Sequence, residues 1–170
     1  MSEVYLGNPN LKKANTEIEF TEEQIIEFLK CKEDPVYFAN NYIKIVSLDE
    51  GLTQFHPYDF QEKLIHNFHE NRFNICKMPR QTGKSTTVVS YLLHYAVFND
   101  SVNIGILANK AATARELLSR LQTAYENLPK WMQQGIISWN KGSMELENGS
   151  KILAASTSAS AVRGMSFNIL

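Results

Sequence analysis

The stretch "CKMPRQTGKSTT", residues 76–87, decides how this sequence is interpreted. Its Gly83-Lys84-Ser85 matches the end of the phosphate-loop pattern G-x-x-x-x-G-K-[ST], but Met78 stands where that pattern has its first glycine. Two interpretations are therefore open. The stretch is either a variant phosphate loop or a chance tripeptide in which Gly83 caps a helix.

The sequence around this stretch favours the phosphate loop. Such a loop needs a strand before it, a tight turn whose N–H groups surround the phosphates, and a helix whose positive end faces the anion. The sequence predicts a strand over 72–78, a turn over 79–83 and a helix from about Lys84. Lys84 then reaches the β- and γ-phosphates, and the Ser85 hydroxyl is a ligand for Mg²⁺. Pro79 fixes φ and shapes the turn by rigidity.

Arg80 is an unusual residue for such a loop. A guanidinium at this position lies close to bound phosphates and is a candidate arginine finger supplied from the same chain. The alternative is a structural arginine that pairs with a nearby carboxylate. The residues by themselves do not separate the two roles.

Composition and charge exclude several classes of protein. At 170 residues and 44% hydrophobic, the chain is long enough for one domain with a core, and it is not disordered, collagenous or fibrous. No apolar run approaches the roughly 20 residues of a membrane span, and no signal peptide opens the chain, which predicts a cytosolic protein. Cys31 and Cys76 form no disulfide framework or metal set, so both are expected to be buried structural thiols.

Charge is distributed unevenly along the chain. Residues 1–50 carry ten acidic and five basic side chains, whereas residues 51–170 carry eight acidic and twelve basic ones. This is not the strongly basic footprint of an autonomous nucleic-acid binder. Any contact with DNA is therefore expected through a few placed residues or within a larger assembly.

Two short helices are predicted near the N-terminus. Thr21 and Gln24 form a capping box for the first, and Asp34 with Pro35 starts the second. The first helix has an apolar face and a hydrophobic staple, made by Phe20, Ile25, Ile26, Phe28 and Leu29. These helices are interpreted as packing elements, with partner binding as the alternative.

The remaining chain alternates between strands and helices. Helices are predicted over 57–70, from about Lys84 to residue 98, and over 111–128. Strands are predicted over 72–78 and 102–108. In the first of these helices, Tyr58 is expected on the inner side. This alternation predicts right-handed βαβ units and a parallel sheet covered on both faces. Asn148-Gly149 predicts a β-hairpin, and Phe167, Ile169 and Leu170 look like the start of another buried strand. The chain is therefore expected to be a fragment.

The run "MPRQTGKSTT" resembles the variant Walker A motif of the large terminase subunits of tailed bacteriophages, most closely the T-even myovirus type. The runs "DPVYFANNY", "ILANKAATARELLSRLQ", "WNKGSMELENGSKI" and "AVRGMSF" are similar to that family too. The resemblance extends over nearly all of residues 6–170.

The resemblance implies an α/β fold with a RecA-like P-loop ATPase core of the ASCE type. Residues 1–50 would form an N-terminal helical extension and residues 51–170 a partial ATPase domain. The implied function is ATP-driven packaging of double-stranded viral DNA into procapsids, with ATP and Mg²⁺ as cofactors. The implied partners are the portal protein, the small terminase subunit and further copies in a ring. The implied location is the cytoplasm of the infected bacterium, transiently at the portal vertex, and no membrane is involved.

The resemblance also assigns roles to particular residues. Gln61 matches the adenine-reading glutamine, whose amide suits the donor and acceptor edge of adenine; the alternative is a polar residue on a helix surface. Gln54 is a weaker second candidate. Arg163 is either a finger toward a neighbouring subunit's nucleotide or a structural loop arginine. The full set expected to contact the nucleotide is Gln61, Arg80, Gln81, Thr82, Gly83, Lys84, Ser85 and Thr86.

The family's Walker B Asp-Glu pair, its coupling motif and its C-terminal nuclease domain would follow Leu170. Because that carboxylate pair orients the metal and activates water, the 170-residue chain is expected to have negligible ATPase and no nuclease activity. Two other interpretations remain: a fragment of a superfamily 2 helicase-like ATPase, and a non-catalytic prophage remnant.

Overall fold

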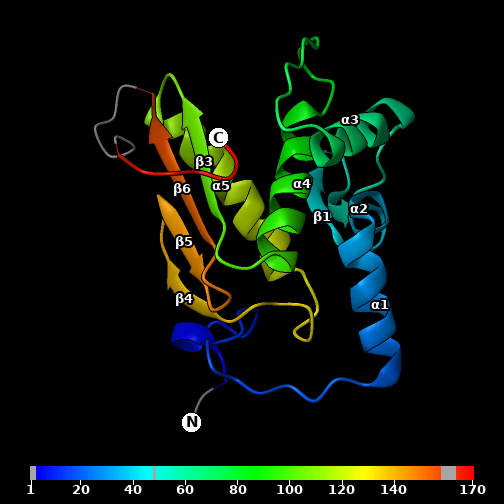
Figure 1. Cartoon of the computed structure of the whole chain (residues 1–170), viewed down its shortest axis with the longest axis vertical. Helices are drawn as coiled ribbons and strands as arrows, with labels where there is room; N and C mark the ends of the chain where they lie inside the picture. The colour runs from blue at the N-terminus through cyan, green and yellow to red at the C-terminus, as the bar shows by residue number, and fades with distance from the viewer. Residues whose placement is uncertain (1–2, 48, 158–163) are drawn as a thin grey trace.

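The computed structural model describes residues 3–47, 49–157 and 164–170. Its helices are η1 (Tyr5–Gly7), α1 (Glu22–Glu33), α2 (Pro35–Tyr42), α3 (Asp59–Glu70), α4 (Lys84–Phe98) and α5 (Ala111–Glu126). Its strands are β1 (Lys44–Ser47), β2 (Gly51–Gln54), β3 (Asn103–Ala108), β4 (Ile136–Trp139), β5 (Ser143–Leu146) and β6 (Lys151–Ser156). Figure 1 shows the larger sheet on one side of the molecule and the main helices on the other.

The larger sheet has the strand order β3-β6-β5-β4. Strands β3 and β6 are parallel, whereas β5 is antiparallel to both β6 and β4. Helix α5 packs on β3 and β6, and α4 packs on α5. The prediction of an α/β fold is confirmed, but the prediction of a parallel sheet covered on both faces is wrong for the described residues. The sheet is mixed, and its helices α4 and α5 lie on one side (Figure 1).

The strand predicted over residues 72–78 does not form. Phe73 is 84% exposed and Ile75 is fully exposed, and the segment belongs to neither described sheet. A strand is stable only when a neighbouring strand pairs its N–H and C=O groups. No described strand lies beside this segment, so its apolar residues stay in solvent. Cys76 lies within it and is exposed, which corrects the prediction of a buried thiol; Cys31 is buried as predicted.

The start signals of α1 and α2 are confirmed. Thr21 and Gln24 form the predicted capping box, and the Asp34 carboxylate accepts hydrogen bonds from the first backbone N–H groups of α2. The predicted apolar face of α1 is only partly buried, however. Phe28 packs against the core, whereas Ile25 is 48% exposed. Ile26, Leu29 and Phe20 are similarly exposed, so the helix shows one apolar side to solvent.

Helix α4 connects the N-terminal helices to the rest of the molecule through an aromatic cluster. The Phe38 ring packs edge-on against Phe98 at 5.3 Å and against His94 at 5.6 Å between ring centroids. His94 is 2% exposed, and its Nε2 donates a hydrogen bond to the Cys31 carbonyl at 2.8 Å. Residues from α1, α2 and α4 thus share one core.

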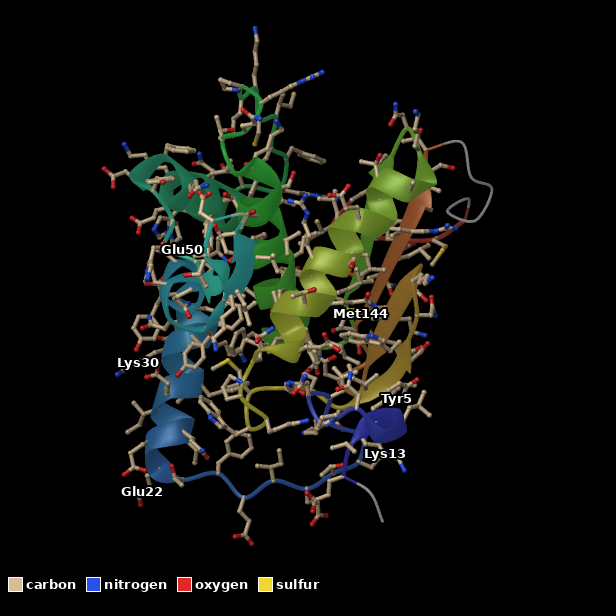
Figure 2. The ribbon with its side chains drawn as sticks, turned by 180° about the vertical axis from the view of Figure 1, so that it is seen from behind. Tyr5, Lys13, Glu22, Lys30, Glu50 and Met144 are labelled. Carbon is tan, nitrogen blue, oxygen red and sulfur yellow. The ribbon has the colours of Figure 1, made fainter. Side chains whose placement is uncertain are left out.

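The N-terminal arm, residues 3–15, is fixed to the sheet by polar contacts. Gln133 is 2% exposed; its Oε1 accepts from the Lys12 backbone N–H, and its Nε2 donates to the carbonyls of Asn10 and Leu128, all at 2.9 Å. The Glu147 carboxylate pairs with Lys12 Nζ at 3.0 Å. Figure 2 shows Tyr5 and Lys13 beside the sheet, while Glu22 starts α1 on the opposite side of the molecule.

Several predicted elements and two unpredicted ones complete the fold. The hairpin at Asn148-Gly149 joins β5 to β6 as predicted. Ile169 forms a parallel bridge with Ile104 of β3, which agrees with a strand beginning there. The β1–β2 ribbon and strand β4 were not predicted. Their strands have only four residues each, although each pairs with a strand nearby in the sequence, as Ser47 does with Gly51 and Trp139 with Met144. Within the described residues, no helix is long and apolar enough to cross a membrane.

Replacing Gln133 with alanine is expected to lower the free energy of unfolding by about 2–4 kcal/mol, because one buried and two partly buried backbone groups lose their partner at once. Urea unfolding would measure the change. Gln122→Ala is the matched control: that side chain makes one exposed hydrogen bond, to the Asn140 carbonyl, and should cost less than about 1 kcal/mol. Equal costs for the two variants would contradict the role of Gln133.

His94 is expected to make the protein less stable in acid. Burial lowers its pKa from 6.5 to about 4, although the hydrogen bond to the Cys31 carbonyl favours the charged form. Between pH 6.5 and 4 the unfolded chain therefore binds a proton that the folded chain does not. Stability falls as pH decreases through this window, by at most about 3 kcal/mol.

The comparison of wild type with His94→Phe, by urea unfolding at several pH values, would test this expectation. The variant should lose most of the pH dependence between 6.5 and 4. His66, which is exposed on α3, provides the control, and His66→Phe should retain the wild-type slope. An unchanged slope in His94→Phe would assign the acid sensitivity to other groups.

Candidate functional site

The turn that precedes α4 has the backbone of an anion-binding loop. Gly83 is the N-cap of the helix and lies in the left-handed region, with φ 70° and ψ 11°. Gln81 is also left-handed, with φ 63°. Left-handed residues of this kind let successive N–H groups converge, and the helix adds its positive end. The helix begins at Lys84, as the sequence predicted.

The loop is closed by its own side chains. The Pro79 carbonyl accepts a hydrogen bond from Thr82 Oγ1 at 3.1 Å and another from Lys84 Nζ at 3.2 Å. The Lys84 ammonium therefore lies against the loop itself. Ser85 and Thr86 follow in the first turn of α4 and are partly buried.

Arg80 is exposed at the tip of the loop. Among the described residues it forms no ion pair, so the predicted alternative of a structural arginine paired with a carboxylate is wrong for this part of the chain. The guanidinium remains available to a ligand. Arg163, the second arginine that the sequence singled out, lies outside the described residues.

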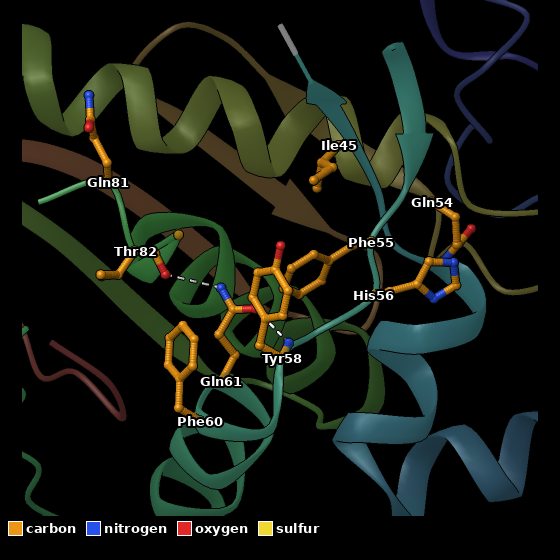
Figure 3. Close-up of a pocket in the computed structure, with 10 residues that line it drawn as sticks. Ile45, Gln54, Phe55, His56, Tyr58, Phe60, Gln61, Gln81 and Thr82 are labelled. Atoms are coloured by element: carbon orange, nitrogen blue, oxygen red, sulfur yellow. Dashed lines mark hydrogen bonds between the residues drawn. The ribbon is translucent and has the colours of Figure 1, made fainter. Parts of the chain in front are cut away.

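A cavity of about 550 Å³ opens beside the loop. Figure 3 shows the loop residues Gln81 and Thr82 on one side of this cavity and β1 and β2 on the other. Its lining residues are Ile45, Gln54, Phe55, His56, Tyr58, Phe60, Gln61, Gln81, Thr82 and Gly83. The cavity and the loop thus share the segment from Gln81 to Gly83.

Two of the aromatic side chains that line the cavity, Tyr58 and Phe60, have a role that the sequence did not predict. Tyr58 and Phe60 are stacked, with ring centroids 5.9 Å apart and an interplanar angle of 13°. Tyr58 is 71% exposed, which corrects its expected place on the inner side of the helix. A sequence signal for this role was present, because Tyr58 and Phe60 are two positions apart at the start of α3 and close to Gln61, the candidate nucleotide-binding glutamine.

Gln61 lies beneath the loop. It is 3% exposed, so the alternative of a polar residue on a helix surface is wrong. Its Oε1 accepts from the Tyr58 N–H at 2.9 Å, and its Nε2 donates to the Thr82 carbonyl at 3.2 Å (Figure 3). The side chain therefore joins the start of α3 to the loop.

Gln54 makes different contacts. Its Nε2 donates to the carbonyls of Ile43 at 2.9 Å and Asn40 at 3.0 Å, which lie at the end of α2. Carbonyls at a helix terminus have no intrahelical partner; the Ile43 carbonyl also accepts a hydrogen bond from the Phe55 N–H at 2.8 Å. Gln54 is one of the residues lining the cavity, but its amide donor serves the backbone of α2.

The described residues contain no group of three or more histidine, cysteine, aspartate or glutamate side chains that could hold a metal ion. Ser85, the residue predicted to contact a metal, lies at the start of α4. The strand predicted over residues 72–78, directly before the loop, does not form. The described part of the chain therefore contains the loop and the helix of the predicted motif without its strand.

The fold defines a class of protein. The structure is similar to the crystal structure of the HK97 bacteriophage large terminase, with a TM-score of 0.63 and 18% sequence identity over 80% of this chain and 29% of that chain. This likeness assigns the fold of a phage large terminase.

The sequence assigns the family. A model described as terminase large subunit, T4likevirus-type, N-terminal, matches residues 75–170, which is more than half of the chain. The chain belongs to this family. The predicted resemblance is therefore confirmed, and the superfamily 2 helicase interpretation is set aside.

Replacing Gly83 with alanine is expected to disturb the loop in two ways. The positive φ costs roughly 1–2 kcal/mol for a residue with a Cβ. The added Cβ would also collide with Gln61 Nε2, and such overpacking adds about 1–3 kcal/mol. Thermal or urea unfolding would measure the sum.

Gly51→Ala is the matched control for this substitution, because Gly51 has φ +71° and no atom within 4 Å of an added Cβ. It should show the cost of the backbone alone. Removing the obstacle in the double variant Gly83→Ala, Gln61→Ala should recover part of the excess. A Gly83 variant no less stable than the Gly51 variant would refute the close packing.

Proposed function

We propose that this chain binds Mg-ATP, with the phosphates on the loop and the base in the adjoining cavity. The observation that carries the proposal is the shared segment from Gln81 to Gly83, which belongs both to the loop and to the cavity wall. A nucleotide is a ligand of this form, because its anionic phosphates and its flat apolar base need two adjoining sites of different chemistry. Its size also suits a cavity of about 550 Å³.

The phosphates are bound by the loop backbone and by the cations around it. The N–H groups at the start of α4 are without intrahelical partners and face an anion favourably. Lys84 releases its bond to the Pro79 carbonyl and pairs with the β- and γ-phosphates. Arg80, exposed and without an ion pair among the described residues, adds a second cation and is the candidate arginine finger of this chain.

The base is bound in the cavity by stacking. Tyr58 and Phe60 offer a pair of aromatic faces, and such faces favour flat ring systems. Phe55 is buried and adds apolar surface to the cavity lining. Recognition of adenine by Gln61 stays a prediction.

Mg²⁺ binds with the nucleotide on this proposal. Ser85 supplies one hydroxyl oxygen from the first turn of α4, and the phosphates and water supply the others, as is usual for this ion. The metal bridges the phosphates and neutralises their charge. Described carboxylates form no cluster around the site, so Ser85 and the nucleotide are the ligands that the proposal names.

The wider role follows from the family. We propose that the chain acts as the nucleotide-binding part of an ATP-driven motor that packages double-stranded viral DNA, with a RecA-like core of the ASCE type. Membership of the T4-like large terminase family supports this role. The portal protein, the small terminase subunit and further copies in a ring are its proposed partners, and the cytoplasm of an infected bacterium with its portal vertices is its proposed location.

Thermal unfolding with and without Mg-ATP tests the proposal. A ligand present at 100 times its Kd adds about 2.7 kcal/mol to the stability of the folded state, which raises the Tm of a chain of this size by about 5–10 °C. Lys84→Ala is expected to remove most of this shift, because it removes the cation closest to the phosphates.

Lys141→Ala is the control, since Lys141 is exposed in a turn away from the loop and should leave the shift unchanged. No shift with the wild-type chain at millimolar Mg-ATP would reject the proposal and favour the non-catalytic remnant. A shift that survives in Lys84→Ala would place the nucleotide elsewhere.

A further inference from the structure

We infer that Thr82 is a positioning residue of the phosphate loop. Its hydroxyl holds the Pro79 carbonyl, and this is the carbonyl that Lys84 leaves when it pairs with phosphates. The hydroxyl thereby keeps the loop closed while the lysine changes its partner. The inference rests on the proposed nucleotide site.

One carbonyl oxygen serves both side chains in the free protein. The Pro79 oxygen accepts from Thr82 Oγ1 at 3.1 Å and from Lys84 Nζ at 3.2 Å. A carbonyl oxygen has two lone pairs, so both bonds exist at the same time. In the proposed complex Lys84 gives up its bond, and Thr82 is then the side chain that still donates to this oxygen.

The Pro79 end of the loop has few other attachments. The segment before it, residues 72–78, belongs to neither described sheet. Within the described ranges, the bonds from Thr82 and Lys84 are the hydrogen bonds that reach residues 75–81. Pro79 itself is exposed. This end of the loop therefore depends on the two side chains that donate to it.

Thr82 is anchored on its other side. Its backbone carbonyl accepts a hydrogen bond at 3.2 Å from Nε2 of Gln61, a residue of α3 that is 3% exposed. Between Pro79 and Thr82 lies Gln81, whose φ of 63° lets the chain fold back, so that the Thr82 hydroxyl meets a carbonyl three positions away. Thr82 thus connects the exposed end of the loop to a buried side chain of α3.

This connection matters for phosphate binding, because N–H groups that are already in place bind an anion more tightly than groups that must be ordered on binding. With the hydroxyl present, the loop stays closed after Lys84 has turned to the phosphates. Without it, the departure of Lys84 frees the Pro79 end, and the loop must be ordered again by the ligand. The loss should be about fivefold in affinity, which corresponds to one hydrogen bond of ordinary strength, and it should not depend on the base.

Calorimetric titration of Thr82→Val with ATP and with inorganic tripolyphosphate, both in the presence of Mg²⁺, tests the inference. Valine has the shape of threonine without the hydroxyl, and we expect both ligands to bind about fivefold more weakly. Thr82→Ser keeps the hydroxyl and should bind both ligands within about twofold of wild type. Unchanged binding in Thr82→Val, or an equal loss in Thr82→Ser, would overturn the inference.

Thr123→Val is the matched control. The Thr123 hydroxyl also donates to a backbone carbonyl, that of Ser119 at 3.0 Å, but it lies within α5 and does not line the cavity. This variant should bind both ligands as wild type does. A loss equal to that of Thr82→Val would contradict a role specific to the loop. Weaker ATP binding with unchanged tripolyphosphate binding in Thr82→Val would place the hydroxyl on the nucleoside, which also contradicts the inference.

NMR relaxation of the ligand-free chain separates a hold on the loop from a direct contact with the ligand. Lys84→Met reproduces the departure of the lysine from the Pro79 carbonyl. The amides of residues 80–83 should keep order parameters near the roughly 0.85 of a rigid backbone in this variant, because Thr82 still holds the loop. In the double variant Lys84→Met, Thr82→Val they should fall below about 0.6.

Two results of this experiment would refute the inference. One is low order parameters in Lys84→Met alone, since the hydroxyl would then not hold the loop. The other is a double variant as rigid as wild type, which would leave a direct contact with the ligand as the cause of any weaker binding. If wild type binds neither ATP nor tripolyphosphate, the proposed function fails, and the order parameters still decide whether Thr82 holds the loop.

Discussion

The burial of α4 is the constraint on which the rest of the structure depends. Ten of its fifteen residues are buried, and α2, α3 and α5 all pack against it. A helix that is apolar on most sides is stable in water only inside a core. Its neighbours are therefore held around it, and α5 in turn packs on the sheet.

The position of the candidate site follows from this burial. Because α4 is fixed along its length, its N-terminus is fixed as well, and the loop from Pro79 to Gly83 lies at the surface next to α3. Helix α3 packs on α4 and brings Gln61 beneath the loop. The site is thus the surface end of the central helix, and its polar parts are positioned by apolar packing some distance away.

Local signals in the sequence predicted much of this. The capping box at Thr21, the Asp34-Pro35 start and the Asn148-Gly149 hairpin were each confirmed, since each depends on residues within a few positions of one another. The start of α4 at Lys84 was predicted for the same reason. Family membership followed from longer runs of sequence that include the loop.

Features that depend on distant partners were not predictable in this way. Residues 72–78 have the composition of a strand, but strand formation needs a neighbour, and none of the described strands lies beside them. The outward apolar side of α1 was misplaced for the same reason. Strand β4 and the β1–β2 ribbon pair with strands nearby in the sequence and were missed because these strands have only four residues each. At the site, the stacked pair Tyr58 and Phe60 became recognisable as part of a cavity only once β1 and β2 were placed opposite.

The sequence by itself determined where α1, α2 and α4 begin, the loop residues and the family, because each of these depends on residues close together in the chain. Only the tertiary structure decided what Gln61 contacts. Its Oε1 accepts from the Tyr58 N–H at the start of α3, a local contact, whereas its Nε2 reaches the Thr82 carbonyl 21 positions away when α3 packs on α4, which no local pattern specifies. The tertiary structure also decided that Arg80 is left without an ion pair among the described residues, since that depends on where every described carboxylate lies.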